Sequence, residues 1–215
     1  MLTVEQMLDA LMNEVVIGKV HLAIGSGLQK ADPVVLATAQ VFFGFTRAAH
    51  LEAAQLYAAR LFDKTSGTVT MLLLLKRLEK KPGALKNGNP ADLRRVICEA
   101  ELKIRGLKTP LNAIMLRRNE WLAHTDPQTI INPGRLDQEA ALTNPDIETI
   151  FGVAAEILNE IASLVSGVTT WPNLLDDDDY EHAMKLIADA KCAEVRAFEA
   201  EFGAPAPFPR PRGCT

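Results

Sequence analysis

Residues 144–167 read NPDIETIFGVAAEILNEIASLVSG, and this stretch decides the fold class. Its apolar side chains recur at intervals of three and four, which is the period of a helix that buries one face. These side chains are Ile147, Ile150, Phe151, Ala154, Ile157, Leu158, Ile161, Leu164 and Val165. Asn144 is placed to cap the helix, Pro145 suits its first turn, and Gly167 can supply a left-handed end. We therefore expect one long core helix here.

The same helical period continues on both sides of this stretch and is interrupted where Gly and Pro cluster. Gly106 and Pro110 are compatible with two separate helices or with one kinked helix. Helices are expected over residues 4–24 (ending near Gly25 and Gly27), 33–64, 69–79, 91–107, from 111 into the Arg118 region, and over 180–201.

No strand is needed to explain the pattern, so the predicted fold is all-α, an up-and-down helical bundle. We expect a single helical domain over residues 1–202, which includes an extra N-terminal helix. Residues 125–143 should form a long loop. Residues 203–215 contain four prolines and should form an extended or disordered tail.

Composition limits the class of protein. The chain has 215 residues, of which 48% are hydrophobic and 23% charged, enough to bury a core and remain soluble. It has neither an apolar run of membrane-spanning length nor a secretory signal, so a cytoplasmic location and no membrane contact are expected. Cys98, Cys192 and Cys214 are far apart in the sequence and lack C-x-x-C spacing, so reduced thiols without a role are expected. No metal or other cofactor is expected.

Charge is distributed unevenly along the chain. The net charge is -4, but residues 76–118 contain 12 basic and 4 acidic side chains, a net of +8 that leaves -12 for the remainder. Such a basic section is typical of a surface that holds a polyanion, although solvated helix faces would give the same count. The candidates for binding RNA phosphates are Arg117, Lys108, Arg105, Arg95 and Arg94.

The basic section ends in a motif, Arg118-Asn119-Glu120-Trp121-Leu122-Ala123-His124. Arg is a permanent cation that can hold phosphate oxygens, and His, with a reference pKa of about 6.5, can exchange a proton near neutral pH. Asn directly after Arg and five positions before His is expected by chance roughly once in a hundred such chains. These are groups with which a protein can cut RNA without a metal.

The expected helix geometry raises two questions about this motif. Arg118 shares a helix face with apolar residues, so its charge needs a partner or an interface. These residues are Leu107, Leu111, Ile114 and Leu122. On an ideal helix His124 lies about 120° from Arg118 and almost beneath Arg117, which is therefore an alternative cation. Either the helix ends near Ala123 and frees His124, or a second copy of the chain completes the site.

With Arg118, Asn119 and His124 in this order, the chain resembles the HEPN superfamily. Residues 123–126, Ala-His-Thr-Asp, are similar to its abortive-infection, AbiU-like branch, and weaker likeness extends the resemblance over residues 35–167. The resemblance implies a homodimer with the active cleft at its interface and a metal-independent endoribonuclease of a bacterial defence or toxin-antitoxin system, with an antitoxin protein as a further partner. Many HEPN members are noncatalytic.

The implied chemistry assigns a role to each motif residue. His124 would deprotonate the ribose 2′-hydroxyl or protonate the departing 5′-oxygen, and Arg118 would stabilise the phosphorane, leaving a 2′,3′-cyclic phosphate. Asn119 would orient His124 or a phosphate. Arg60, Asp63 and Asp126 are candidates for supporting positions, with an i,i+3 surface pair as the alternative for Arg60 and Asp63.

Other functions are compatible with the same residues. A noncatalytic dimer could use this cleft to bind RNA, a nucleotide or a partner protein. A metal-dependent hydrolase using His124 and Asp126 is disfavoured, because the chain lacks H-x-H and H-E-x-x-H signatures. His124 could also be a helix-terminal histidine that interacts with the last carbonyl groups.

Overall fold

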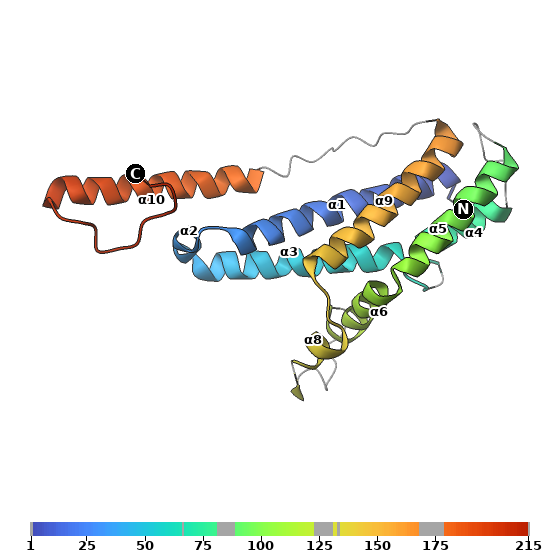
Figure 1. Cartoon of the computed structure of the whole chain (residues 1–215), viewed down its shortest axis with the longest axis horizontal. Helices are drawn as coiled ribbons and strands as arrows, with labels where there is room; N and C mark the ends of the chain where they lie inside the picture. Colours follow the sequence, from blue (N-terminus) through green and yellow to red (C-terminus); the bar gives the residue numbers. More distant parts are fainter. Residues whose placement is uncertain are drawn as a thin grey trace. The chain divides into compact units, whose positions relative to one another are not determined.

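The computed structural model describes residues 2–65, 67–80, 89–122, 131–132, 134–167 and 179–214. Within these ranges the chain forms helices and no strand, which confirms the all-α prediction. The helices are α1 (Val4–Lys30), α2 (Pro33–Ala37), α3 (Gln40–Leu61), α4 (Met71–Lys80), α5 (Pro90–Gly106), α6 (Lys108–Arg117), the π-helical turn η2 (Arg118–Leu122), α8 (Arg135–Glu139), α9 (Asn144–Ser166) and α10 (Asp179–Phe202) (Figure 1).

The chain divides into two compact units. Unit 1 comprises Met1–Leu22 and Glu52–Leu174, and unit 2 comprises Ala23–Leu51 and Leu175–Thr215. Helices α1 and α3 each contribute to both units. A single domain over residues 1–202 stays a prediction.

Helix α9 forms the centre of the core of unit 1, as its periodicity predicts. Nine of its residues are buried, and it packs against α5 and α6 (Figure 1). Each apolar side chain fully buried in this way contributes roughly 1.5–3 kcal/mol. In the described part of the chain α9 also has the length and composition to cross a membrane, but its buried stripe is what a core helix requires.

The two ends of α9 differ in how well local sequence predicts them. The N-cap is Thr143 and not Asn144: its hydroxyl accepts a hydrogen bond from the Asp146 amide (3.3 Å), and the Asp146 carboxylate accepts one from the Thr143 amide (2.8 Å). Hydrogen bonds to the carboxylate, first that from the Thr143 hydroxyl, lower the pKa of Asp146. Gly167 ends the helix in the left-handed region with φ 76°, as predicted.

The expected end of the first helix near Gly25 and Gly27 is wrong, because α1 continues through both glycines to Lys30. A Cβ atom on Gly25 would lie 2.7 Å from the Leu51 side chain, and one on Gly27 would overlap the ring of Tyr180. These glycines therefore allow neighbouring side chains in unit 2 to approach the helix closely, and they do not terminate it.

The single helix predicted over residues 33–64 is also wrong, since it is divided into α2 and α3. The amides of Thr38 and Ala39 bond to carbonyls three residues back, at 3.1 and 3.3 Å, and the Thr38 hydroxyl donates to the Val35 carbonyl at 2.7 Å. This tight turn with a competing side-chain bond interrupts the α-helical pattern.

The structure decides between the two arrangements at Gly106 and Pro110. Leu107, with φ -85° and ψ 8°, separates α5 from α6, so these are two helices, and the second begins at Lys108 and not at residue 111. The described part of the predicted loop over residues 125–143 contains the short helix α8. Residues 123–130 and 133 lie outside the described ranges.

The C-terminal tail is non-helical, as predicted, but the expectation that it is disordered needs correction. The Phe208 ring lies 5.8 Å from that of Phe198, and the Glu199 carboxylate accepts hydrogen bonds from the Ala206 amide (3.2 Å) and from Arg210. Pro211 is buried. These aromatic and charged contacts hold the segment against α10. The proline-rich composition gave no indication of them.

Substitution of Gly18 tests the packing of α1 in unit 1. A Cβ atom there would overlap the Phe151 ring and lie 2.9 Å from Tyr57 Cβ, so Gly18→Ala should lower the free energy of unfolding by about 1–3 kcal/mol. Gly152 is a helical glycine at which an added Cβ would meet no atom within 4 Å apart from its chain neighbours and the helix's own backbone, so Gly152→Ala should raise the free energy of unfolding by roughly 0.5–1 kcal/mol. Chemical denaturation measures both, and equal effects would contradict this packing.

Candidate functional site

Arg118 lies on an apolar helix face and is paired there with Asp63. Its Nη1 donates to Oδ2 of Asp63 at 2.6 Å, with 23% of the arginine side chain and 16% of the aspartate side chain exposed. Asp63 lies two residues beyond the end of α3, and Arg118 is the first residue of η2. The pair joins two segments 55 residues apart in the sequence.

Asp63 is itself held in place by the residues that follow α3. Its Oδ1 accepts hydrogen bonds from the Thr65 amide (3.0 Å) and the Thr65 hydroxyl (2.9 Å), which leaves Oδ2 for Arg118. Desolvation raises the pKa of Asp63, but the bonds from Thr65 and then from Arg118 outweigh it and hold the pKa below its usual value. The carboxylate is therefore ionised at neutral pH and fixes the guanidinium.

Asn119 contacts the same guanidinium from the adjacent position. Its Oδ1 accepts a hydrogen bond from Arg118 Nε at 3.1 Å, so the amide oxygen orients Arg118. Among the residues that the structure describes, Nη2 of Arg118 makes no hydrogen bond. Nη2 is therefore the guanidinium nitrogen that neither Asp63 nor Asn119 binds.

The motif begins with a change in helix type. Residues Arg118–Leu122 form a π-helical turn, in which each bond spans five residues, directly after α6. Such turns are rare and occur frequently at functional sites. Here the turn starts at Arg118.

Arg117 points to a different partner and has a different role in the fold. Its Nε donates to the Ala140 carbonyl and its Nη2 to the Asp137 carboxylate, both at 2.7 Å, and only 19% of its side chain is exposed. These bonds hold α8 beside α6 (Figure 1). Because its donors are used in this way, Arg117 is disfavoured as the working cation.

Glu120 completes the attachment of the motif to α8. Its carboxylate is hydrogen-bonded to Arg135, which also donates to Glu139 at 2.8 Å. The pKa of Arg135 is raised, first by the hydrogen bond to Glu120. Successive residues of the motif are therefore clamped between the end of α3 on one side and α8 on the other.

The remaining predicted site residues are not all accounted for. His124 and Asp126 lie outside the described residues, so their roles stay predictions. Arg60 pairs with Glu14 at 3.5 Å and lies 5.3 Å from the Tyr57 ring centroid. An i,i+3 pair of Arg60 with Asp63 is therefore wrong, and Asp63 contacts Arg118 instead.

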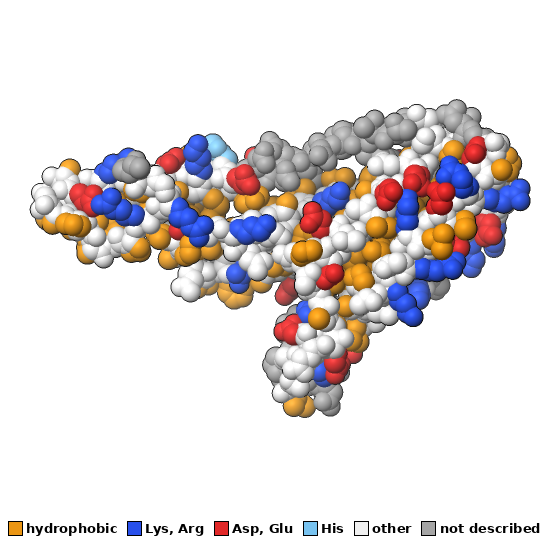
Figure 2. Space-filling model, in the orientation of Figure 1, with side chains coloured by type: hydrophobic (Ala, Val, Ile, Leu, Met, Phe, Trp, Pro, Cys, Tyr) orange, Lys and Arg blue, Asp and Glu red, His pale blue; other side chains and the backbone are white. Residues whose placement is uncertain are grey.

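The basic section does not form one uniform surface. Lys and Arg side chains gather over α4 and α5 in Figure 2, with acidic side chains among them. Arg95 bonds to both oxygens of Glu99 at 2.9 Å, and Arg105 to Glu101 at 3.4 Å, one turn away in each case. Arg94 is exposed and donates to the Pro90 carbonyl at 3.3 Å.

Two lysines of this section differ sharply in their surroundings. Lys103 bridges to α9 through Glu156 (2.9 Å) and Glu160 (2.8 Å), and the hydrogen bond to Glu160 is the main cause of its raised pKa. It is therefore part of the packing between helices. Lys108 is exposed at the start of α6, about 15 Å along the helix from Arg118.

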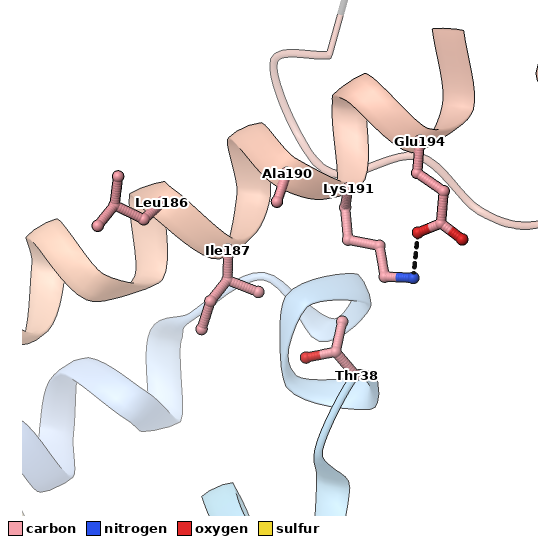
Figure 3. Close-up of a pocket in the computed structure, with 6 residues that line it drawn as sticks. All are labelled: Thr38, Leu186, Ile187, Ala190, Lys191 and Glu194. Atoms are coloured by element: carbon pink, nitrogen blue, oxygen red, sulfur yellow. Dashed lines mark hydrogen bonds and ion pairs between the residues drawn. The ribbon is translucent and has the colours of Figure 1, made fainter. Parts of the chain in front are cut away.

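A hollow of about 320 Å³ lies in unit 2, between α2 and α10 (Figure 3). Its lining residues are Thr38, Leu186, Ile187, Ala190, Lys191 and Glu194. Lys191 and Glu194 form an ion pair at 2.6 Å, and the wall is otherwise mainly apolar. None of the predicted site residues lines it. Among the described residues no group of three or more His, Cys, Asp or Glu could hold a metal ion.

Comparison with protein families identifies the group to which this chain belongs. The model of the HEPN_AbiU2 family, described as AbiU2, matches residues 1–186. The chain belongs to the HEPN AbiU2 family. The AbiU2 match includes α1 and the first part of α10, so it is broader than the resemblance over residues 35–167. A search of the curated proteins and a search of the solved structures each gave no match.

The sequence analysis did not identify three residues that hold the motif in place. These are Thr65, Glu120 and Arg135, each of which bonds to the motif or to its partner. Thr65 had a detectable signal, because an Asp two residues before a Thr after a helix is typical of a side-chain-stabilised turn. The pairing of Glu120 with Arg135 depends on how α8 folds back.

Asp63→Asn tests the ion pair with Arg118. At pH 7 the substitution should lower the free energy of unfolding by about 1–3 kcal/mol. Because the folded pKa of Asp63 is depressed, this difference should shrink as the pH falls below about 4.

Asp137→Asn is the control. The Asp137 side chain is 76% exposed, so this substitution should lower the free energy of unfolding by only about 0–1 kcal/mol. Urea denaturation at several pH values measures both, and a difference that does not change with pH would contradict this account.

Proposed function

We propose that this AbiU2 protein is a metal-independent endoribonuclease that acts in the cytoplasm as a homodimer in a bacterial defence or toxin-antitoxin system. The observation that carries the proposal is the fixed guanidinium of Arg118. Asp63 and Asn119 orient it, and its Nη2 edge is left for a phosphate oxygen. A preorientated cation loses little entropy when charge develops on a phosphorane, and this is the usual form of electrostatic catalysis.

The proposed reaction is a transfer within the RNA strand. His124 removes the proton of a ribose 2′-hydroxyl, whose oxygen attacks the adjacent phosphorus, and the departing 5′-oxygen takes up a proton. Arg118 stabilises the added negative charge of the phosphorane. The products are a 2′,3′-cyclic phosphate and a free 5′-hydroxyl. With two chains at one cleft, one His124 would serve as the base and the other as the acid.

An exposed apolar surface supports self-association. On the half of α3 that belongs to unit 2, Val41, Phe42 and Phe45 are 73%, 64% and 74% exposed. They lie on adjoining positions of the helix, where spacings of three and four bring side chains together. Large aromatic side chains this exposed are typical of interfaces, because a second copy that covers them removes apolar area from water.

A noncatalytic AbiU2 module that binds RNA, a nucleotide or a partner protein through the same cleft is the second candidate. It is favoured by the carboxylates that already pair with the cations: Asp63 with Arg118, Glu99 with Arg95, and Glu101 with Arg105. These pairs reduce the local positive charge. An antitoxin protein or a nucleotide could then be held without cleavage.

RNA cleavage by the purified protein in excess EDTA distinguishes the two candidates. We expect fragments that end in 2′,3′-cyclic phosphate, and we expect Arg118→Ala and His124→Ala each to lower the rate by about 10²–10⁴-fold. Arg210→Ala is the matched control, because that side chain is 49% exposed, pairs with Glu199 in unit 2 and is not a candidate site residue, so this variant should cut like wild type.

Two outcomes of this assay would count against catalysis. Saturable RNA binding without product would support the noncatalytic module. Unchanged cleavage by both motif variants would show that the activity arises elsewhere.

Phe45→Asp tests the self-association. A carboxylate in place of an exposed ring should weaken the dimer by at least about tenfold, measured by analytical ultracentrifugation. Leu102→Asp on α5 is the control, because Leu102 is also exposed, at 57%, but lies in unit 1. An identical sedimentation profile for the two variants would mean that this surface of α3 does not hold the dimer.

A further inference from the structure

The C-terminal tail brings two cysteines together that are far apart in the sequence. Cys192 lies on α10 and is 8% exposed, whereas Cys214 is half-buried in the tail. A side-chain hydrogen bond with Cys214 is the main cause of the raised pKa of the Cys192 thiol, which places the two thiols next to each other. Both are free thiols in this structure, and they lie together although they are far apart in the sequence.

The approach of Cys214 to Cys192 is supported by several separate contacts of the tail. Phe208 packs edge-on against Phe198, and Glu199 binds both the Ala206 amide and Arg210. Past the buried Pro211 the chain turns back, with the Cys214 amide bonded to the Pro211 carbonyl at 3.2 Å. These contacts restrict where the cysteine can reach.

The amide of Arg212 extends this anchoring to a second helix. It donates to the side chain of Asp32, which is also the N-cap of α2. This bond is the main cause of the lowered pKa of Asp32. The tail is thus held between α10 and the start of α2, within unit 2.

We propose that Cys192 and Cys214 form an intramolecular disulfide when the protein meets a peroxide, and that this bond locks the tail onto α10. In the first step the Cys214 sulfur attacks hydrogen peroxide, giving a sulfenic acid and one water. In the second step the Cys192 sulfur displaces the sulfenic oxygen, which leaves as a second water. Two thiols are oxidised, and the peroxide is reduced.

The surroundings of the two thiols determine the order of these steps. The hydrogen bond with Cys214, and then burial, raise the pKa of the Cys192 thiol, so this residue keeps its proton. Cys214 is the more accessible sulfur and meets the oxidant first. Cys192 is the resolving thiol, already in contact with the sulfenic acid as it forms. The inference does not depend on the proposed ribonuclease activity.

The experiment uses the full-length chain, treated with hydrogen peroxide, alkylated and then digested with trypsin without reduction. Wild type should lose two hydrogen atoms by intact mass and yield a peptide that joins residues 192–196 to 213–215. Dithiothreitol should reverse both changes. Cys98→Ser, which removes an exposed thiol on α5, should behave like wild type, whereas Cys192→Ser and Cys214→Ser should not form the linked peptide.

Cys192 is buried, so Cys192→Ser could fail to fold, and a further variant that keeps both thiols is needed. Phe208→Ala removes an aromatic anchor of the tail but no thiol, and it should slow formation of the linked peptide by about tenfold. Alkylation of Cys98 should be unchanged in this variant. Peroxide-induced links between chains, links to Cys98, or no linked peptide in wild type would each overturn the proposal.

Discussion

An arginine on the apolar face of a helix must be paired, and the ion pair between Arg118 and Asp63 meets this constraint. Its carboxylate is fixed in turn by Thr65, so three residues from the end of α3 and the start of η2 act as one unit. The cost of removing charge from water is offset only where such bonds have good geometry. The pair therefore determines where the motif lies and which way its cation points.

The second attachment of the motif has a different physical character. Arg117 binds a backbone carbonyl and a carboxylate of the α8 region, and Glu120 binds Arg135. Beneath these polar bonds lies a small apolar cluster of Ala113, Leu136 and Ala140. The adjacent arginines thus have different partners: Arg117 holds the α8 region, and Arg118 pairs with Asp63 beyond the end of α3. The sequence places them on different helix faces, but it does not show which partner each one meets.

The fold was predictable wherever the signal was a repeated local pattern. The buried stripe of α9 and its left-handed end at Gly167 followed from spacing and backbone preference. The errors arose where a tertiary contact reversed the meaning of a local signal. Gly25 and Gly27 resemble helix ends in the sequence, but they are sites of close packing against Leu51 and Tyr180. Likewise, the prolines of the tail predicted an extended or disordered segment, although Phe208 and Arg210 hold it against α10. No local sequence pattern indicates that Asp63 pairs with Arg118.

The π-helical turn has a consequence for how this region tolerates changes in length. A turn whose bonds span five residues accommodates one residue more than an α-helix would over the same turn. Deleting a single residue between Arg118 and Leu122 would let the segment relax to a regular helix with little change of phase between the residues on either side of the deletion. The same deletion within α6 would rotate the later residues by about 100° relative to the earlier ones. The π-helical turn therefore absorbs a change in length that α6 could not absorb.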